Sequence, residues 1–521
     1  MSETWVGHSE LRYEDLQLVR GAGQFVDDIV LPGICHCSVF RSPHAHARIR
    51  SLDVAAAKAA PGVLAVIIAI DLKKAGFGEL PVPGGLKRGN GEPQYMPHYP
   101  ILAEDRVRWV GDCIALVVAE SAAQAADAVQ LIAVDFEVLP SVTSTAAATA
   151  ASAPRVWDDC ANNICFVERI GNNEAVDASF AKADRIIKHN FEISRVTAAS
   201  LEPRAAIGDY STKDGRYTLY ANLQHIHSIR TDLASAVLKM PESKIRVVVP
   251  DVGGSFGMKS ALSNEIALVL IASKLLGRPV KWISTRSEAF LSDPQGRDNV
   301  TEAELALDKN GIFLALRVKT TAAIGAYLQR SMPAFTLNAG SLAGCYRTPA
   351  IYVEATGVFT NTNPVRPYRG NGRPEAAYVI ERMVDIAAAE IGVDPAELRR
   401  RNYIPPSAMP FKTGLNFIYD SGEFEKNMDL ALALADVESL AARKAQARMR
   451  GKLLGLGISN TIERAGAASS EGAEIRFSRS GTATLFSGSV AQGQLQTGEF
   501  LKGGKATSLF LNRYRLYEFP W

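Results

Sequence analysis

One stretch of the chain joins a buried strand, a glycine-rich turn and a long apolar helix. Ile245–Pro250 is apolar enough to predict a strand, and Asn264–Leu276 predicts the helix. Between them lies Asp251-Val-Gly-Gly-Ser-Phe-Gly257. A turn of this kind exposes backbone N–H groups near the positive end of a helix, a geometry that suits an anion or an oxo ligand. The order strand, turn, helix favours an α/β fold and makes this turn the best local candidate for a functional site.

Two nucleotide-binding patterns do not fit the turn. A phosphate-binding P-loop needs glycine directly before lysine, whereas Met258 stands before Lys259. The spacing of the dinucleotide fingerprint G-x-G-x-x-G is also absent there. A tight turn that simply requires glycine remains an alternative interpretation, and a nucleotide-binding enzyme that uses Gly253–Lys259 as an imperfect phosphate loop is a further one.

Apolar periodicity divides the chain into three mixed α/β (α+β) units. The first covers 12–141, and the small-residue segment 142–158 is expected to link it to the second, 159–405. A third unit covers 423–494, and the tail 495–521 shows no amphipathic period.

The third unit is expected to begin with one helix from about 423 through Met449. A strand over Leu453–Ile462 follows, and two more strands flank the turn Ser478–Gly481. Further up the chain, Tyr378–Ile391 predicts a helix, and Asp394 is expected to cap the N-terminus of the next one.

Composition excludes several classes of protein. The 521 residues carry 57 Lys and Arg against 55 Asp and Glu, so no global basic field indicates nucleic-acid binding. No apolar run approaches the roughly 18 residues that span a bilayer, and the N-terminus lacks the pattern of a secretory signal, so we expect a soluble cytoplasmic protein. Six cysteines are too few for a disulfide scaffold and are expected to be reduced and mostly buried.

A second candidate site is the loop 361–375, rich in arginine, glycine and proline. Its arginines, Arg366, Arg369 and Arg373, could fix an anionic group. The alternative is a surface loop whose arginines pair with Glu375 and Glu381.

Two weaker candidates remain. Leu201-Glu-Pro-Arg204 is favoured as an ordinary turn with a local ion pair. His36, His44 and His46 lack the three or four convergent ligands of a metal site and are expected to contact solvent or make hydrogen bonds.

These motifs occur in one order that resembles a known family. The series consists of Gly21–Pro32 with Ser42-Pro-His-Ala45, Trp109-Val-Gly-Asp112, Leu201–Arg204, Gly253–Lys259, Tyr368–Glu375 and Asp394–Asn402. Over about residues 12–494 the chain resembles the molybdenum-binding large subunit of the xanthine dehydrogenase/aldehyde oxidase family, which includes carbon monoxide dehydrogenase large-subunit-like proteins.

The resemblance implies a fold, a cofactor and partners. The fold is an N-terminal α/β hammerhead domain followed by molybdopterin-binding domains, the last one incomplete. The cofactor is molybdopterin with molybdenum, in its cytosine dinucleotide form. The partners are an iron–sulfur small subunit and an FAD medium subunit, assembled as a dimer of heterotrimers. The reaction is hydroxylation of a small molecule with water as the oxygen source.

The resemblance also assigns roles to residues that match the family motifs. Cofactor-binding positions are Gly254, Ser255, Phe256, Gly257, Arg369 and Gln494. Substrate-facing positions are Ser260 and Asn371. The family's metal is held by the pterin rather than by side chains.

Two departures from the family's motifs narrow the range of possible substrates. Purine-oxidising relatives carry a glutamate where this chain has Ser260, and carbon monoxide dehydrogenases carry a cysteine close to the arginine, where this chain has Gly370. Xanthine and carbon monoxide are therefore disfavoured, and an aldehyde or an N-heteroaromatic compound is favoured.

A third departure concerns the end of the chain. Leu495 replaces an expected glycine, and Leu495–Trp521 resembles nothing in the family, so the late glutamate that acts as general base is absent. We therefore expect a chain truncated at its C-terminus and inactive or nearly so. The alternative is a non-catalytic fragment that docks on the iron–sulfur and flavin subunits without binding cofactor.

Overall fold

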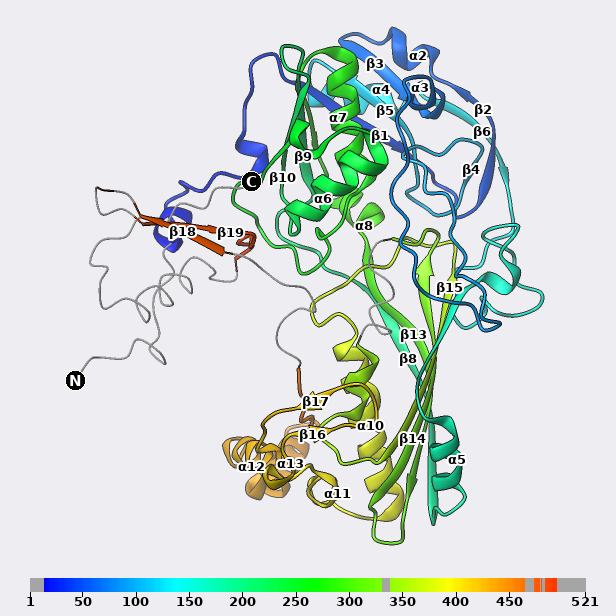
Figure 1. Cartoon of the computed structure of the whole chain (residues 1–521), viewed down its shortest axis with the longest axis vertical. Helices are drawn as coiled ribbons and strands as arrows, with labels where there is room; N and C mark the ends of the chain where they lie inside the picture. The colour runs from blue at the N-terminus through cyan, green and yellow to red at the C-terminus, as the bar shows by residue number, and fades with distance from the viewer. Residues whose placement is uncertain (1–13, 330–337, 464–472, 478, 480–482, 494–521) are drawn as a thin grey trace.

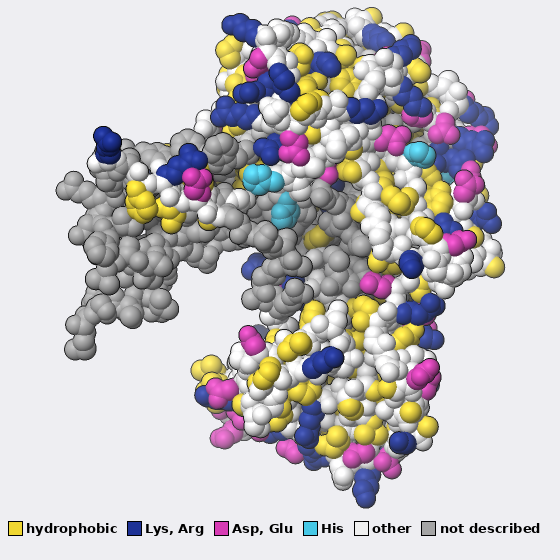
Figure 2. Space-filling view, in the orientation of Figure 1, with side chains coloured by type: hydrophobic (Ala, Val, Ile, Leu, Met, Phe, Trp, Pro, Cys, Tyr) yellow, Lys and Arg dark blue, Asp and Glu magenta, His cyan; other side chains and the backbone are white. Residues whose placement is uncertain are grey.

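The computed structural model describes residues 14–329, 338–463, 473–477, 479 and 483–493. Two lobes lie one above the other in Figure 1, each built on its own sheet, and long strands run from the lower lobe toward the upper one. Lys and Arg side chains are interspersed with Asp and Glu over the visible face of both lobes (Figure 2).

The upper lobe holds a seven-stranded sheet in the order β11-β10-β9-β12-β1-β5-β3. These strands are β1 (Cys35–Arg41), β3 (Val63–Ile68), β5 (Cys113–Ala119), β9 (Ala205–Ser211), β10 (Arg216–Ala221), β11 (Ile245–Val248) and β12 (Val280–Ile283). Because β1 pairs in parallel with β12, one sheet combines strands from two units that the sequence separates.

The helix α7 (Asn264–Leu276) covers this sheet, with its first ten residues buried. Gly208 of β9 permits the close approach, since a Cβ there would collide with the carbonyl of Val269. On the same lobe, α6 (Ile226–Asp232) passes into a π-helical turn at Leu233–Val237.

The rest of the N-terminal unit packs beside the sheet. A smaller sheet has the order β4-β2-β6. Its strands are β2 (Ala47–Asp53), β4 (Arg106–Val107) and β6 (Ala133–Val138). The helices α2 (Ala55–Ala59), α3 (Ala69–Lys74) and α4 (Ala122–Val129) contact strands of the seven-stranded sheet, and α1 (Asp15–Leu18) lies near Asp251.

The segment 142–158 contains no helix or strand, yet it is packed into the protein. Ala148 and Val156 are fully buried. The indole N–H of Trp157 donates to the carbonyl of Ala326 at 2.9 Å. The segment is therefore a fixed connection between the units.

The lower lobe holds a five-stranded sheet in the order β7-β15-β14-β13-β8. Its strands and helices are β7 (Ile164–Gly171), β8 (Arg185–Thr197), β13 (Gln295–Leu307), β14 (Phe313–Gly325), β15 (Ala350–Phe359), α5 (Asn173–Phe180), α10 (Arg373–Ile391) and α11 (Pro395–Asn402). The predicted cap is confirmed, because the Asp394 carboxylate accepts from the N–H groups of Ala396 and Glu397.

Two predictions for the third unit are wrong. The single helix from 423 is two helices, α12 (Phe424–Leu434) and α13 (Leu440–Met449), because Asp436 adopts a left-handed conformation with φ 48° between them. Leu453–Ile462 forms no strand; its side chains are mostly exposed, and it pairs with no other strand among the described residues.

The expected hairpin is confirmed, because β18 (Ala473–Phe477) pairs antiparallel with β19 (Ala483–Ser487). Two short strands, β16 (Phe411–Lys412) and β17 (Ile418–Tyr419), form a further hairpin. Within the described part of the chain, no helix is long and apolar enough to cross a membrane.

Candidate functional site

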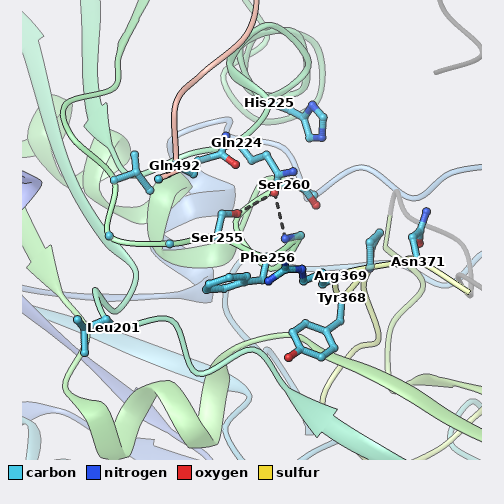
Figure 3. Close-up of a pocket in the computed structure, with 18 of the residues that line it drawn as sticks. Leu201, Gln224, His225, Ser255, Phe256, Ser260, Tyr368, Arg369, Asn371 and Gln492 are labelled. Carbon is cyan, nitrogen blue, oxygen red and sulfur yellow. Dashed lines mark hydrogen bonds between the residues drawn. The ribbon is translucent and has the colours of Figure 1, made fainter. Parts of the chain in front are cut away.

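The glycine-rich turn and the arginine-rich loop line one pocket of about 1110 Å³. Figure 3 shows Phe256 and Arg369 close together, with Gln224 and Ser255 beside them. Leu201, His225, Ser260, Tyr368, Asn371 and Gln492 also line the cavity. Gln494, the remaining predicted cofactor residue, and the tail from Leu495 lie outside the described residues.

The two segments are in direct backbone contact. The N–H of Arg369 donates to the carbonyl of Phe256 at 2.9 Å. Gly257 has φ +96°, and a Cβ at this position would lie 2.5 Å from the carbonyl oxygen of Pro367. Glycine is thus required at 257 both by its backbone conformation and by the close approach of the loop.

Gln224 holds the glycine-rich turn from one side. Its Oε1 accepts from the hydroxyl of Ser255 at 2.7 Å and from the N–H of Gly257 at 3.1 Å. Gln224 follows β10, which pairs in parallel with β11, the strand that leads into the turn. The ends of parallel neighbours meet at one edge of a sheet, so this order of strands is the signal that could have found Gln224 in the sequence.

Glu202 and Lys259 hold the turn from the other side. The Glu202 carboxylate accepts from the N–H of Gly253 at 2.8 Å, and Lys259 Nζ donates to the Glu202 carbonyl at 2.9 Å. Burial lowers the pKa of Lys259 to about 8, against the opposing effect of the Glu202 charge.

The predicted local ion pair of the 201–204 turn is wrong. Arg204 turns into the core, where it binds Glu265 at 2.6 Å and Asp293 at 2.7 Å. Arg41 of β1 binds the same Glu265 at 2.7 Å. These opposite charges hold the pKa of Glu265 well below its ordinary value, although its burial acts to raise it.

Arg297 holds the arginine corner at Tyr368–Arg369. Its guanidinium donates to the carbonyls of Tyr368 and Arg369, each at 3.0 Å. Arg297 and Asp298 both have left-handed backbones inside β13, with φ 67° and 74°. Such conformations are costly for residues other than glycine, and no sequence signal predicts them at these two positions.

The pairing of loop arginines with Glu375 and Glu381 is wrong. Glu375 lies 3.7 Å from Arg297, and Glu381 binds Arg399. Arg373 lies 3.6 Å from Glu463 instead.

Several polar groups face the cavity without a partner. Within the described residues, the N–H groups of Gly254 and Phe256 have no acceptor, and Ser260 Oγ and Asn371 Oδ1 are buried and unbonded. A buried polar group without a partner is costly. The donors and the volume therefore fit a large polar ligand that brings oxo or phosphate oxygens, as the molybdopterin implied by the resemblance does.

The remaining candidates lie elsewhere. His46 Nδ1 is 2.8 Å from the carbonyl of Pro140, and His44 packs edge-on against Phe136. All six cysteines are buried and unpaired, as predicted. No group of three or more His, Cys, Asp or Glu within the described ranges could hold a metal ion.

Two family models match the chain. Residues 20–140 match the aldehyde oxidase and xanthine dehydrogenase a/b hammerhead domain. Residues 156–403 match the molybdopterin cofactor-binding domain.

Relatives match nearly the whole chain. The carbon monoxide dehydrogenase large chain of Afipia carboxidovorans is 34% identical over 94% of this chain and 63% of its own length. Among solved structures, quinoline 2-oxidoreductase from Pseudomonas putida 86 is 32% identical, with a TM-score of 0.89 over 99% of this chain and 66% of its own. A Cu,Mo-CO dehydrogenase is 31% identical, with a TM-score of 0.87 over 98% of this chain and 67% of its own. The chain thus spans a little under two thirds of the length of the curated relative.

Proposed function

We propose that this chain, which belongs to the xanthine dehydrogenase/aldehyde oxidase family as a molybdopterin-binding large subunit, serves a molybdenum hydroxylase. The reaction is oxidative hydroxylation of an aldehyde or an N-heteroaromatic compound, with water as the oxygen source. The observation that carries the proposal is the contact between the glycine-rich turn and the arginine corner, which line one pocket.

Several residues of the pocket would hold the cofactor, each through a different contact. The N–H groups of Gly254 and Phe256 would donate to oxygen atoms of the cofactor, and Ser255 is held by its hydrogen bond to Gln224. Gly257 lets Arg369 approach the same oxygens. When bound, molybdopterin, in the cytosine dinucleotide form, supplies the two-electron redox chemistry, while the protein supplies position and polarity.

The substrate end of the pocket is aromatic and partly polar. Phe256, which is 42% exposed, and Tyr368 both line the cavity. Flat rings of this kind favour a planar substrate, and the unbonded Ser260 Oγ and Asn371 Oδ1 can bind its polar edge. Gly370 follows Arg369, and the loop 361–375 contains no cysteine, so we favour an organic substrate over carbon monoxide.

Electrons from the reaction leave through partners. We propose an iron–sulfur small subunit and an FAD medium subunit, in a dimer of heterotrimers. The relatives support a subunit role, because the one from Afipia carboxidovorans is named a large chain.

Metal content and turnover test the proposal together. The full chain, expressed with molybdenum and its partner subunits, is expected to hold molybdenum by mass spectrometry and to reduce a dye with an aldehyde or with quinoline at a low rate. Arg369→Met is expected to lower turnover at least tenfold, the scale of losing one charge-stabilising donor. The control Arg382→Met changes a half-exposed arginine that is bound to Asp385, and it is expected to leave turnover unchanged.

Other outcomes distinguish the alternatives. A metal-free chain that co-purifies with the iron–sulfur and flavin subunits supports the non-catalytic fragment. Thermal stabilisation by ATP supports the nucleotide-binding alternative. Stoichiometric molybdenum with full turnover contradicts the prediction that the chain is impaired.

A further inference from the structure

Arg366 lies two residues before the arginine corner's Tyr368, yet its side chain turns inward, and it is only 2% exposed. Its guanidinium donates to the carbonyls of Ala261 at 3.1 Å and Leu262 at 2.7 Å, with Met258 at 3.5 Å. Nε donates to Gln329 Oε1. All of these acceptors are neutral oxygens.

A buried cation whose hydrogen bonds include no carboxylate acceptor is unusual, because desolvation disfavours the charged form. Burial lowers the pKa of Arg366 to about 10, a value at which the side chain is still charged at neutral pH. The carboxylates of Glu265 and Asp293 favour its charge from a distance, but they are bound to Arg204. Stability alone does not account for this arrangement, and the carbonyls that Arg366 holds indicate another role.

Those carbonyls belong to the loop that follows the glycine-rich turn. Ser260, whose hydroxyl faces the pocket unbonded, lies inside the loop between Met258 and Ala261. The two segments contact each other at three successive points: Arg369 with Phe256, Pro367 with Gly257, and Arg366 with the carbonyls of 258–262. The first two points are close backbone contacts, and only the third is made by a side chain.

We propose that Arg366 is a positioning residue for the pocket: it fixes the carbonyls of Met258–Leu262 so that Ser260 faces the cavity. Arginine suits this role because its planar fork reaches several acceptors at fixed angles, whereas lysine offers a single point of charge. The inference depends on the proposed function only for its turnover readout.

Hydrogen–deuterium exchange of the full chain tests the inference without any turnover. In Arg366→Lys, the amides of 257–263 are expected to exchange at least tenfold faster than in wild type. The matched control is Arg399→Lys, which changes an equally buried arginine bound to Glu381 and Asp385 in the lower lobe. The control is expected to lose thermal stability to a similar degree while exchange at 257–263 stays unchanged.

A milder variant guards against loss of folding. Gln329→Leu removes the side-chain acceptor that Arg366 has among the described residues and keeps the cation, so exchange at 257–263 is expected to rise about threefold. Equal exchange at 257–263 in Arg366→Lys, Gln329→Leu and the Arg399→Lys control overturns the positioning role.

Turnover separates this inference from the proposed function. If the wild type oxidises an aldehyde or quinoline, Arg366→Lys is expected to lower kcat/KM at least tenfold, and Arg399→Lys less than twofold. A wild type without molybdenum or turnover contradicts the proposed function, and the exchange result still decides the role of Arg366.

Discussion

Gly257→Ala is the most informative single change, because it adds one methyl group where the glycine-rich turn meets the arginine corner. The added Cβ would lie 2.5 Å from the carbonyl oxygen of Pro367, a backbone atom that cannot rotate away. The backbone at 257 also has φ +96°, which an alanine adopts only under strain.

The structure provides a matched control in Gly91. Its φ is +88°, close to that of Gly257, but a Cβ there would meet nothing within 4 Å. Left-handed strain costs both variants about 1–2 kcal/mol. Overpacking against the loop backbone adds about 1–3 kcal/mol for Gly257→Ala alone.

Urea denaturation of the two variants measures this difference. Gly257→Ala is expected to lose about 2–5 kcal/mol of unfolding free energy and Gly91→Ala about 1–2 kcal/mol. Equal losses, within about 0.5 kcal/mol, would mean that the turn and the loop are not in contact at Gly257, and the account of the pocket would be wrong.

Four further substitutions test other parts of the structure. Burial raises the pKa of Asp112 to about 6, so its stabilising contribution is full at low pH and is lost as pH rises through about 6. Asp112→Asn should remove this loss, so its unfolding free energy should gain about 3 kcal/mol on wild type between about pH 4 and pH 7. Urea titration at each pH measures this gain. Arg204→Met removes the arginine that pairs with buried Asp293 and one of the two arginines that pair with Glu265, and it should cost about 3–5 kcal/mol in the same assay. Arg278→Met breaks a partly exposed pair with Glu120 and a hydrogen bond to the carbonyl of Gly33, and it should cost at most about 1 kcal/mol. Asp394→Ala removes a helix cap and should lower the unfolding free energy by about 1 kcal/mol, so an unchanged value would contradict the observed cap.

The sequence predicted those helices and strands that have a distinct local pattern of apolar residues. The helix at Asn264–Leu276 was predicted at its observed bounds, because a long apolar run between turn residues is unambiguous. Leu453–Ile462 has a similar local pattern but no partner strand among the described residues, and pairing is a property of the whole fold.

The sequence likewise indicated some residues of the candidate site and missed others. The glycines of the turn and Arg369 were found because their residue types are tied to backbone geometry and to charge. Arg297 and Lys259 were missed as parts of the site, because the strained backbone of one and the burial of the other arise only from tertiary packing. The direction of Arg366 was missed for that reason too, since a charged loop residue is ordinarily expected at the surface.

Anomalous X-ray scattering at the molybdenum edge would show directly whether the pocket holds the metal, in crystals of the chain expressed with molybdenum and its partner subunits. The account predicts one molybdenum peak inside the pocket, between the turn at Gly254–Gly257 and the guanidinium of Arg369. A peak elsewhere in the chain, or a molybdenum-free pocket in protein from molybdenum-replete cells, would contradict it.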